Sequence, residues 1–169
     1  MNYHDLYECD MNNGKGARVT LFLSGCDHGC KGCYNVETWC PNSGKAFTAE
    51  TEDRIIELLQ DKKMVRAGLS LSGGDPLHPA NINGVFDLLS RVKSECPDKN
   101  VWLWTGYTKE EIDKEYREDP NMISTGRAMI MGMVDVMIDG KFEQDKHKAN
   151  LKWRGSENQI IHNFSNIEI

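Results

Sequence analysis

Apolar residues recur along the chain with two periods, one typical of strands and one typical of helices. Val19, Leu21 and Leu23 fall on one face of an extended segment, which predicts a first strand over residues 18–24. Four more short apolar segments predict further strands, at residues 68–72, 101–104, 134–138 and 158–162. The segment that precedes the first strand, residues 1–17, is polar and ends in an expected loop at residues 12–16.

Helical spacing occurs between these strands. Thr48 is a good N-cap residue, and the acidic residues and apolar stripe that follow it predict a helix that ends near Lys62. A second helix is expected between Asn81, as its N-cap, and Pro97, which stops it. Both helices have an apolar face to bury against a sheet.

A third, shorter helix is expected after Thr108, because Thr108 and Glu111 have the spacing of a capping box. Residues 128–133 are apolar and are also expected to be helical. Residues 36–47 are expected to be irregular and residues 117–127 to form a loop, and the charged residues 143–150 are expected to be exposed.

Strands that alternate with helices predict an α/β domain with a mainly parallel sheet. The chain of 169 residues fits a single domain, residues 1–169, and is long enough to bury a hydrophobic core. A closed eight-stranded barrel needs about 250 residues. We therefore expect a partial, open (β/α) barrel.

Composition narrows the class of protein. Apolar residues make up 39% and charged residues 27%, as in ordinary globular proteins. No run of 18 apolar residues could span a membrane, and the polar N-terminus lacks the apolar core of a signal peptide, so we expect a cytoplasmic protein. The net charge of −6 argues against a nucleic-acid partner.

The most informative polar stretch is CDHGCKGCYN, residues 26–35, directly after the first strand. It places Cys26, Cys30 and Cys33 at the spacing C-x3-C-x2-C, and its two glycines permit a tight loop on which three thiolates converge. A [4Fe–4S] cluster normally takes four protein thiolates. Three would hold the cluster and leave one iron open to a ligand, as in catalytic metal sites.

Two other interpretations of these cysteines stay open. One is a structural zinc site with Cys9, Cys40 or His28 as the fourth ligand, although no second C-x2-C pair is present. The other is a set of unrelated core cysteines. Cys9, Cys40 and Cys96 are themselves expected to be buried free thiols.

Three further motifs follow the later strands. They are SGGDP at residues 72–76, TGY at 105–107 and DGK at 139–141. Ligands of parallel α/β folds bind at the carboxyl ends of the strands, so these motifs are expected to share one site. Glycines in the first motif would let the backbone approach a ligand closely. The segment WRGS at 153–156 either closes over that ligand or is a solvated turn.

The form GCx3CxGCYN at residues 25–35 resembles the signature of radical S-adenosylmethionine (radical SAM) enzymes, and in particular the glycyl-radical-enzyme activases. Other segments resemble the branch of activases that serves anaerobic ribonucleoside-triphosphate reductase. They are MNYH at 1–4, SLSGGDPLHP at 70–79, WLWTGY at 102–107, DGKF at 139–142 and WRGS at 153–156. These segments follow one another over most of the chain.

The resemblance implies one [4Fe–4S] cluster on Cys26, Cys30 and Cys33, with SAM bound to the open iron. It also implies a set of SAM-binding residues: Gly32, Cys33, Tyr34, Ser72, Gly73, Gly74, Asp139 and Lys141. Gly32 stands where many relatives carry an aromatic residue, so Tyr34 is expected to supply the ring near the adenine. Lys141 suits the SAM carboxylate, and Asp139 suits a ribose hydroxyl or Lys141 itself.

The activity that the resemblance implies is reductive cleavage of SAM, followed by abstraction of a hydrogen atom from a glycine of the large reductase subunit. The electron would come from a low-potential donor such as reduced flavodoxin. No acid–base residue is required. Two alternatives remain: an activase of another glycyl-radical enzyme, such as pyruvate formate-lyase, and a zinc-binding module without catalysis.

Overall fold

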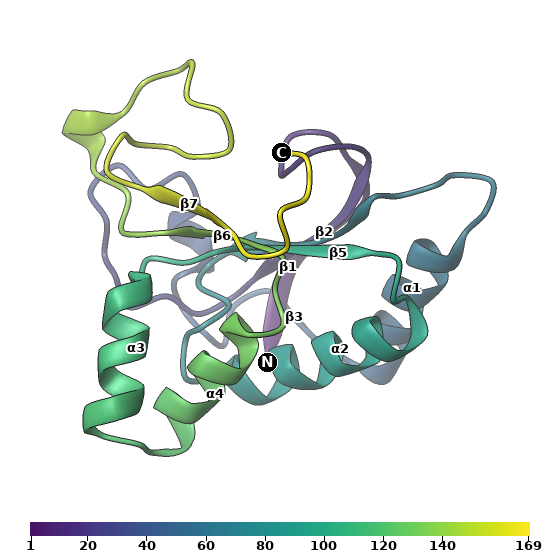
Figure 1. The fold of residues 1–169 in the computed structure, drawn as a ribbon, viewed down its shortest axis with the longest axis horizontal. Helices are drawn as coiled ribbons and strands as arrows, with labels where there is room; N and C mark the ends of the chain where they lie inside the picture. Colours follow the sequence, from purple (N-terminus) through teal and green to yellow (C-terminus); the bar gives the residue numbers. More distant parts are fainter.

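A computed structural model describes residues 1–169 as a mixed sheet of seven strands with helices packed against one face (Figure 1). The strand order is β3-β1-β2-β4-β5-β6-β7. The strands are β1 (Asn2–Asp10), β2 (Arg18–Leu23), β3 (Lys45–Ala46), β4 (Gly68–Gly73), β5 (Asn100–Trp104), β6 (Val136–Asp139) and β7 (Ile160–Asn163). The predicted α/β class is therefore confirmed, whereas the open barrel stays a prediction.

The sheet is parallel only in its centre. β2, β4, β5 and β6 run parallel to one another, whereas β1, β3 and β7 pair antiparallel with their neighbours. The prediction of a mainly parallel sheet thus holds for the four central strands and fails at both edges. The connections from β1 to β2, from β2 to β3 and from β6 to β7 contain no crossover α-helix, and parallel neighbours need such a crossover.

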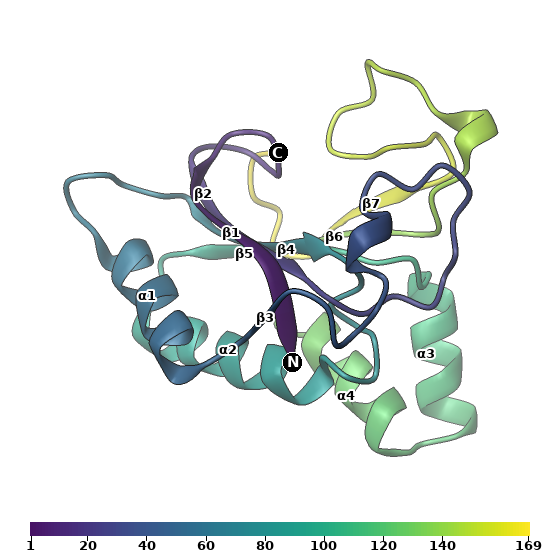
Figure 2. The ribbon, with the colours of Figure 1, turned by 180° about the vertical axis from the view of Figure 1, so that it is seen from behind.

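The helices are α1 (Ala49–Gln60), α2 (Ile82–Glu95), α3 (Lys109–Glu118) and α4 (Met122–Met131), with short 3-10 turns at Val36–Thr38 and Gln144–Lys146. The Thr48 hydroxyl accepts the N–H of Thr51, and Thr108 and Glu111 form the predicted capping box. The four helices lie on one side of the sheet, and the loops of residues 11–17 and 140–159 lie on the other (Figures 1 and 2). None of the helices combines the length and apolarity that crossing a membrane requires.

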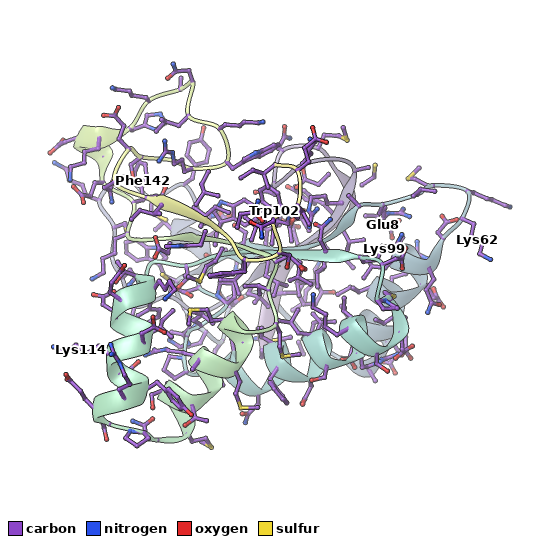
Figure 3. All side chains as sticks on the ribbon, in the orientation of Figure 1. Glu8, Lys62, Lys99, Trp102, Lys114 and Phe142 are labelled. Atoms are coloured by element: carbon purple, nitrogen blue, oxygen red, sulfur yellow. The ribbon has the colours of Figure 1, made fainter.

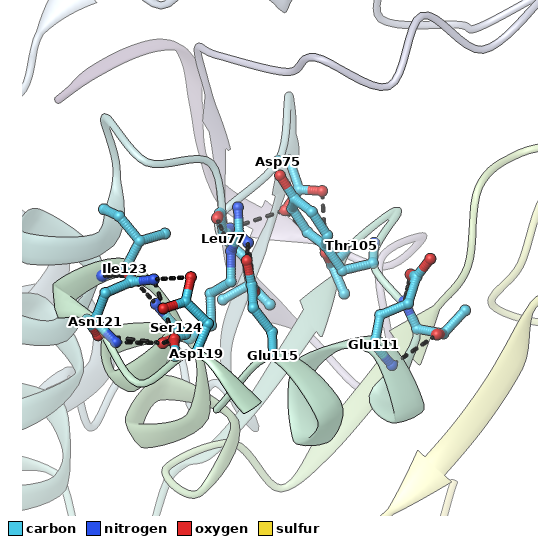
Figure 4. Close-up of polar contacts among 12 residues, drawn as sticks. Asp75, Leu77, Thr105, Glu111, Glu115, Asp119, Asn121, Ile123 and Ser124 are labelled. Carbon is cyan, nitrogen blue, oxygen red and sulfur yellow. Dashed lines mark hydrogen bonds and ion pairs between the residues drawn. The ribbon is translucent and has the colours of Figure 1, made fainter. Parts of the chain in front are cut away.

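Three features of these elements differ from what the sequence indicates. Residues 2–10 form a strand, β1, that was not predicted because these residues are polar; much of β1 stays exposed while its backbone pairs with β2. Within 117–127, the loop is only a short link, since the Asn121 side chain accepts the N–H groups of Ile123 and Ser124 and starts α4 (Figure 4). Asn81 precedes α2 without capping it, because its amide donates to the carbonyls of Ser24 and Asp75.

The two faces of the sheet carry different side chains. On the helical side, Val101 and Leu103 of β5 join a cluster of 22 buried residues. On the other side, Trp102 packs with Val136 and Ile138. Trp102 and Phe142 both lie on that second side (Figure 3). This alternation follows from the two-residue period of a strand.

Candidate functional site

A cavity of about 430 Å³ lies at the carboxyl ends of the central strands. The loop after β2 contributes all three cysteines of the C-x3-C-x2-C motif to its lining. Ser72, Gly73 and Gly74 come from the end of β4, and Trp104, Thr105 and Gly106 come from the end of β5. The prediction that the strand-end motifs would share one site is therefore confirmed for the first three strands.

Backbone geometry turns the cysteine loop toward the cavity. Gly29 and Gly32 have φ angles of 61° and 73°, in the left-handed region that favours glycine. The N–H of Cys33 donates to the carbonyl of Cys30 at 3.1 Å, which closes a turn between the last two cysteines. The N–H of Cys26 donates to the carbonyl of Trp39 at 3.0 Å and so fixes the start of the loop.

Burial is the main influence on two of the thiols. It raises the pKa of Cys26 from 9.0 to about 11, and it raises the pKa of Cys30. The backbone amides of His28 and Phe142 act in the opposite direction as donors to Cys26 and Cys30, and lower the pKa of each thiol by a smaller amount. The N–H of Asn35 donates to Cys33 Sγ at 3.4 Å. The backbone N–H donors alone do not offset the effect of burial, so stable thiolates in this pocket need a cationic ligand as well.

The other cysteines lie apart from this cavity. Cys9 and Cys40 are exposed and only Cys96 is buried, so the prediction of three buried free thiols was wrong for the first two. Cys9 lies on the exposed part of β1 and Cys40 in the turn before β3, where no helix covers them. No three His, Cys, Asp or Glu side chains of the chain converge closely enough to hold a single metal ion.

The glycines at the end of β4 line the cavity and also allow a close contact within the chain. A Cβ on Gly73 would lie 2.7 Å from the Leu23 nitrogen, and a Cβ on Gly74 would lie 2.6 Å from the Gly25 carbonyl oxygen. These glycines therefore let the end of β4 approach the chain that enters the cysteine loop. The side-chain amide of Asn35 adds a bond of 3.0 Å to the carbonyl of Gly73.

Asp139 and Lys141 do not line the cavity, although Gly140 between them does. The buried carboxylate of Asp139 accepts the N–H of Lys109 at 2.7 Å and lies 2.9 Å from His162 Nε2. Its ion-pair partner in the structure is His162, so of the two contacts expected for Asp139 the one with Lys141 is not formed. Lys141 is exposed, and its charge lowers the pKa of Cys30 slightly against the effect of burial.

Two residues of the cysteine loop lie at the rim. Tyr34 lines the cavity with its side chain fully exposed to solvent. Gly32 lies against the side chain of Gln144, which a Cβ on Gly32 would approach to 2.8 Å. This part of the rim is therefore formed by the cysteine loop and the loop after β6 together.

The loop after β6 forms a wall of the cavity, and the sequence analysis identified only part of it. Phe142 belongs to the DGKF segment, whereas Gln144, His147 and Gln159 also line the cavity and lie in irregular, mostly charged surroundings that gave no signal. Within residues 153–156, Gly155 lines the cavity and Ser156 is buried, and the Trp153 carbonyl accepts the indole N–H of Trp104 at 2.7 Å. The segment is therefore packed against the site, so the solvated turn was the wrong alternative.

A polar cluster in the lining of the cavity was also missed. The buried Asp75 carboxylate contacts His28 of the cysteine loop as well as Thr105 and Gly106 after β5 (Figure 4 shows the contact with Thr105). The sequence placed these residues in three separate motifs. Only the fold brings the ends of β2, β4 and β5 together at one carboxylate.

Comparisons with known proteins agree with this arrangement. Residues 12–162 match the family model described as a 4Fe-4S single cluster domain. The chain is 52% identical over 165 residues to a protein of Vibrio cholerae named anaerobic ribonucleoside-triphosphate reductase-activating protein, with 98% of this chain and 99% of the relative covered.

Proteins with the same name occur in Escherichia coli K12 and in Enterobacteria phage T4. The Escherichia coli protein is 46% identical, with 97% of this chain and 99% of the relative covered. The phage T4 protein is 43% identical, with 95% of this chain and 93% of the relative covered. A likeness at this level of identity extends along nearly the whole of both chains, through the cysteine loop and the strand ends. The chain therefore belongs to the family of anaerobic ribonucleoside-triphosphate reductase-activating proteins.

Proposed function

We propose that this chain is a radical SAM oxidoreductase that activates anaerobic ribonucleoside-triphosphate reductase by generating a glycyl radical on its large subunit. The observation that carries the proposal is that three cysteines and a glycine-rich strand end line one cavity, in a chain of this family. The names of the relatives favour this reductase over other glycyl-radical enzymes as the partner.

The residues present fit a [4Fe–4S] cluster. Cys26, Cys30 and Cys33 would hold three of its irons, and all three line a common cavity. The iron charge would offset the burial that raises the pKa of Cys26 and Cys30. Amide donors to the sulfurs are one way in which proteins adjust the potential of such clusters.

The cavity volume of about 430 Å³ lies within the range of small-molecule sites. Ser72, Gly73 and Gly74 would contact SAM with their backbone, and Tyr34 and Gly32 would border its adenine from the rim. Lys141 would act on the SAM carboxylate as a charge beside Cys30. Asp139 would influence the site through its contacts with Lys109 and His162, without touching the ribose of SAM.

When bound, the cluster would supply the electron for reductive cleavage of SAM, and SAM would supply the group that takes a hydrogen atom from the glycine. The chain's own part is to bind, orient and shield these groups. Its cavity is bordered by loops on the side of the sheet that the helices leave uncovered. A glycine-bearing segment of the partner suits such a site, because glycine has no side chain to exclude the radical carbon.

Anaerobic reconstitution tests the cluster. Iron and sulfide should approach about four of each per chain, and the electron paramagnetic resonance (EPR) spectrum of the reduced protein should change when SAM is added. A colourless protein with one zinc per chain, and no EPR signal after reduction, would refute the proposal. It would favour the zinc-binding module instead.

A second experiment tests the partner. The protein is mixed with SAM, a low-potential reductant such as reduced flavodoxin, and reductase labelled with α-deuterated glycine. A glycyl EPR doublet should form, and deuterium should appear in 5′-deoxyadenosine. SAM turnover without the doublet and without deuterium transfer would point to another substrate.

A further inference from the structure

One buried group beside the cavity has no part in the proposed reaction. The Asp75 carboxylate, directly after β4, is only 2% exposed. Its Oδ1 accepts the N–H of Leu77 at 2.8 Å, and Thr105 Oγ1 donates to the two oxygens at 2.9 and 3.0 Å. The N–H of Gly106 donates to Oδ2 at 2.9 Å. Asp75 thus joins the end of β4 to the end of β5.

The remaining contact of this carboxylate reaches the cysteine loop. His28 Nε2 lies 2.6 Å from Asp75 Oδ2, and the imidazole is 8% exposed. Its ring meets the ring of Tyr107 edge-on, with the centroids 4.6 Å apart. A Cβ on Gly106 would overlap the imidazole. His28 is therefore enclosed by a carboxylate, an aromatic ring and a glycine that leaves room for it.

We infer that His28 is a positioning residue, which ties the cysteine loop to the ends of β4 and β5 through Asp75 and does not ligate the metal. It stands midway between Cys26 and Cys30, so a fixed imidazole fixes the backbone from which both thiols project. The neighbouring Gly29 has no heavy atom within 4 Å of where its Cβ would lie and cannot supply that restraint. The inference rests on the proposed function for its cluster, although the tether itself exists in the metal-free chain.

A second pair between the same two segments provides the matched control. His78 Nε2 lies 3.1 Å from Asp27 Oδ2, but the Asp27 side chain is 73% exposed, whereas that of Asp75 is buried. Exposed ion pairs contribute little. Asp27→Asn removes a charge one residue from His28 and leaves the buried contact in place.

The tether is tested first in the metal-free protein, by the rate at which iodoacetamide alkylates Cys26 and Cys30, followed by mass spectrometry. His28→Leu should accelerate alkylation about 10- to 100-fold, as expected for loss of a hydrogen bond to a charged group. His28→Gln retains an N–H donor near Nε2 and should return the rate to within about threefold of the unaltered protein. Asp27→Asn should change it by less than about twofold.

Two substitutions, Gly106→Ala and Asp75→Asn, leave the sequence of the cysteine loop intact. Gly106→Ala should displace the imidazole and accelerate alkylation as His28→Leu does. In a double-mutant cycle, His28→Leu in the Asp75→Asn background should add nothing to the rate, because the two residues act as one unit. Circular dichroism identifies any variant that has lost its fold, and the rates are compared among the folded ones.

The reconstituted protein provides the second readout. His28→Leu should still bind iron but release it to a chelator about tenfold faster, at the lower end of the range for residues that orient metal ligands. Iron loss in His28→Gln as complete as in Cys30→Ala would make His28 a ligand and overturn the inference. Alkylation at the unaltered rate in both His28→Leu and Gly106→Ala would also overturn it. Failure of the unaltered protein to bind iron would refute the proposed function alone.

Discussion

The two faces of the sheet differ in their side chains and in the elements that cover them. The helical face buries aliphatic side chains such as Leu21, Leu71 and Leu103 under α-helices. The other face carries the three-residue cluster around Trp102 and is covered by loops. It also buries a charged side chain, Arg18, whose guanidinium donates to Ser70 Oγ and Asn100 Oδ1 at 2.7 Å each.

This difference indicates that the helical face mainly stabilises the fold, whereas the loop-covered face borders the candidate site. Aliphatic burial against helices is non-directional and supplies most of the folding free energy. The loop-covered face buries polar groups that each need a partner, and burial lowers the pKa of Arg18 to about 10. The candidate site lies at the end of the strands where the loops of this second face meet the cysteine loop.

The largest effect is expected at the site. Cys30→Ala should abolish cluster binding, because two thiolates cannot secure the cubane, while the metal-free protein keeps its thermal stability to within about 1 kcal/mol. Iron analysis and circular dichroism measure the two quantities. Cys40→Ala, which removes an exposed thiol outside the cavity, is the control and should keep its iron. Equal loss of iron in both variants would contradict the assignment of an open iron.

The helical face should dominate the free energy of unfolding. Leu103→Ala removes a fully buried side chain from the large cluster and should destabilise the protein by about 3–5 kcal/mol in urea unfolding. Ile138→Ala removes an equally buried side chain from the loop-covered face and should cost about 2 kcal/mol, because loops collapse into a cavity more readily than helices. A larger cost for Ile138→Ala would reverse the comparison.

A smaller effect is expected from pH. The raised pKa of Cys26 in the folded chain means that burial of the neutral thiol contributes stability below about pH 9, which is lost as the pH rises toward about 11. Allowing for the partial exposure of the thiol, the loss is about 1–2 kcal/mol. Urea midpoints of the metal-free protein at pH 8 and pH 11 measure it. The same loss in Cys26→Ala would assign the effect to other groups.

The smallest effect is expected at Lys141, which is exposed and lies outside the cavity lining. Lys141→Ala should weaken SAM binding by about 0.2–1 kcal/mol, and high salt should remove most of the difference. Isothermal titration at low and high salt measures both. A tenfold or greater, salt-independent loss would place the ammonium group in direct contact with SAM.

Local patterns predicted the elements whose stabilising contacts are near in sequence. Thr48, and Thr108 with Glu111, cap helices through bonds to residues three positions away, and both were predicted correctly. β1 was missed because its partner strand, not its own composition, orders it. Asn81 was assigned a local cap, yet its amide bonds to Ser24, which is 57 residues away in the sequence.

The sequence by itself determined the cysteine spacing, the order of strand-end motifs and hence the chemistry that the loop can support. These features depend on residue type and on separations of a few residues, which a sequence displays directly. The tertiary structure alone decided that Asp75 meets both His28 and Thr105, and that Asp139 turns away from the cavity toward His162. Those contacts span 23 to 47 residues and exist only once β2, β4, β5, β6 and β7 are registered side by side, because hydrogen bonds require partners within about 3 Å.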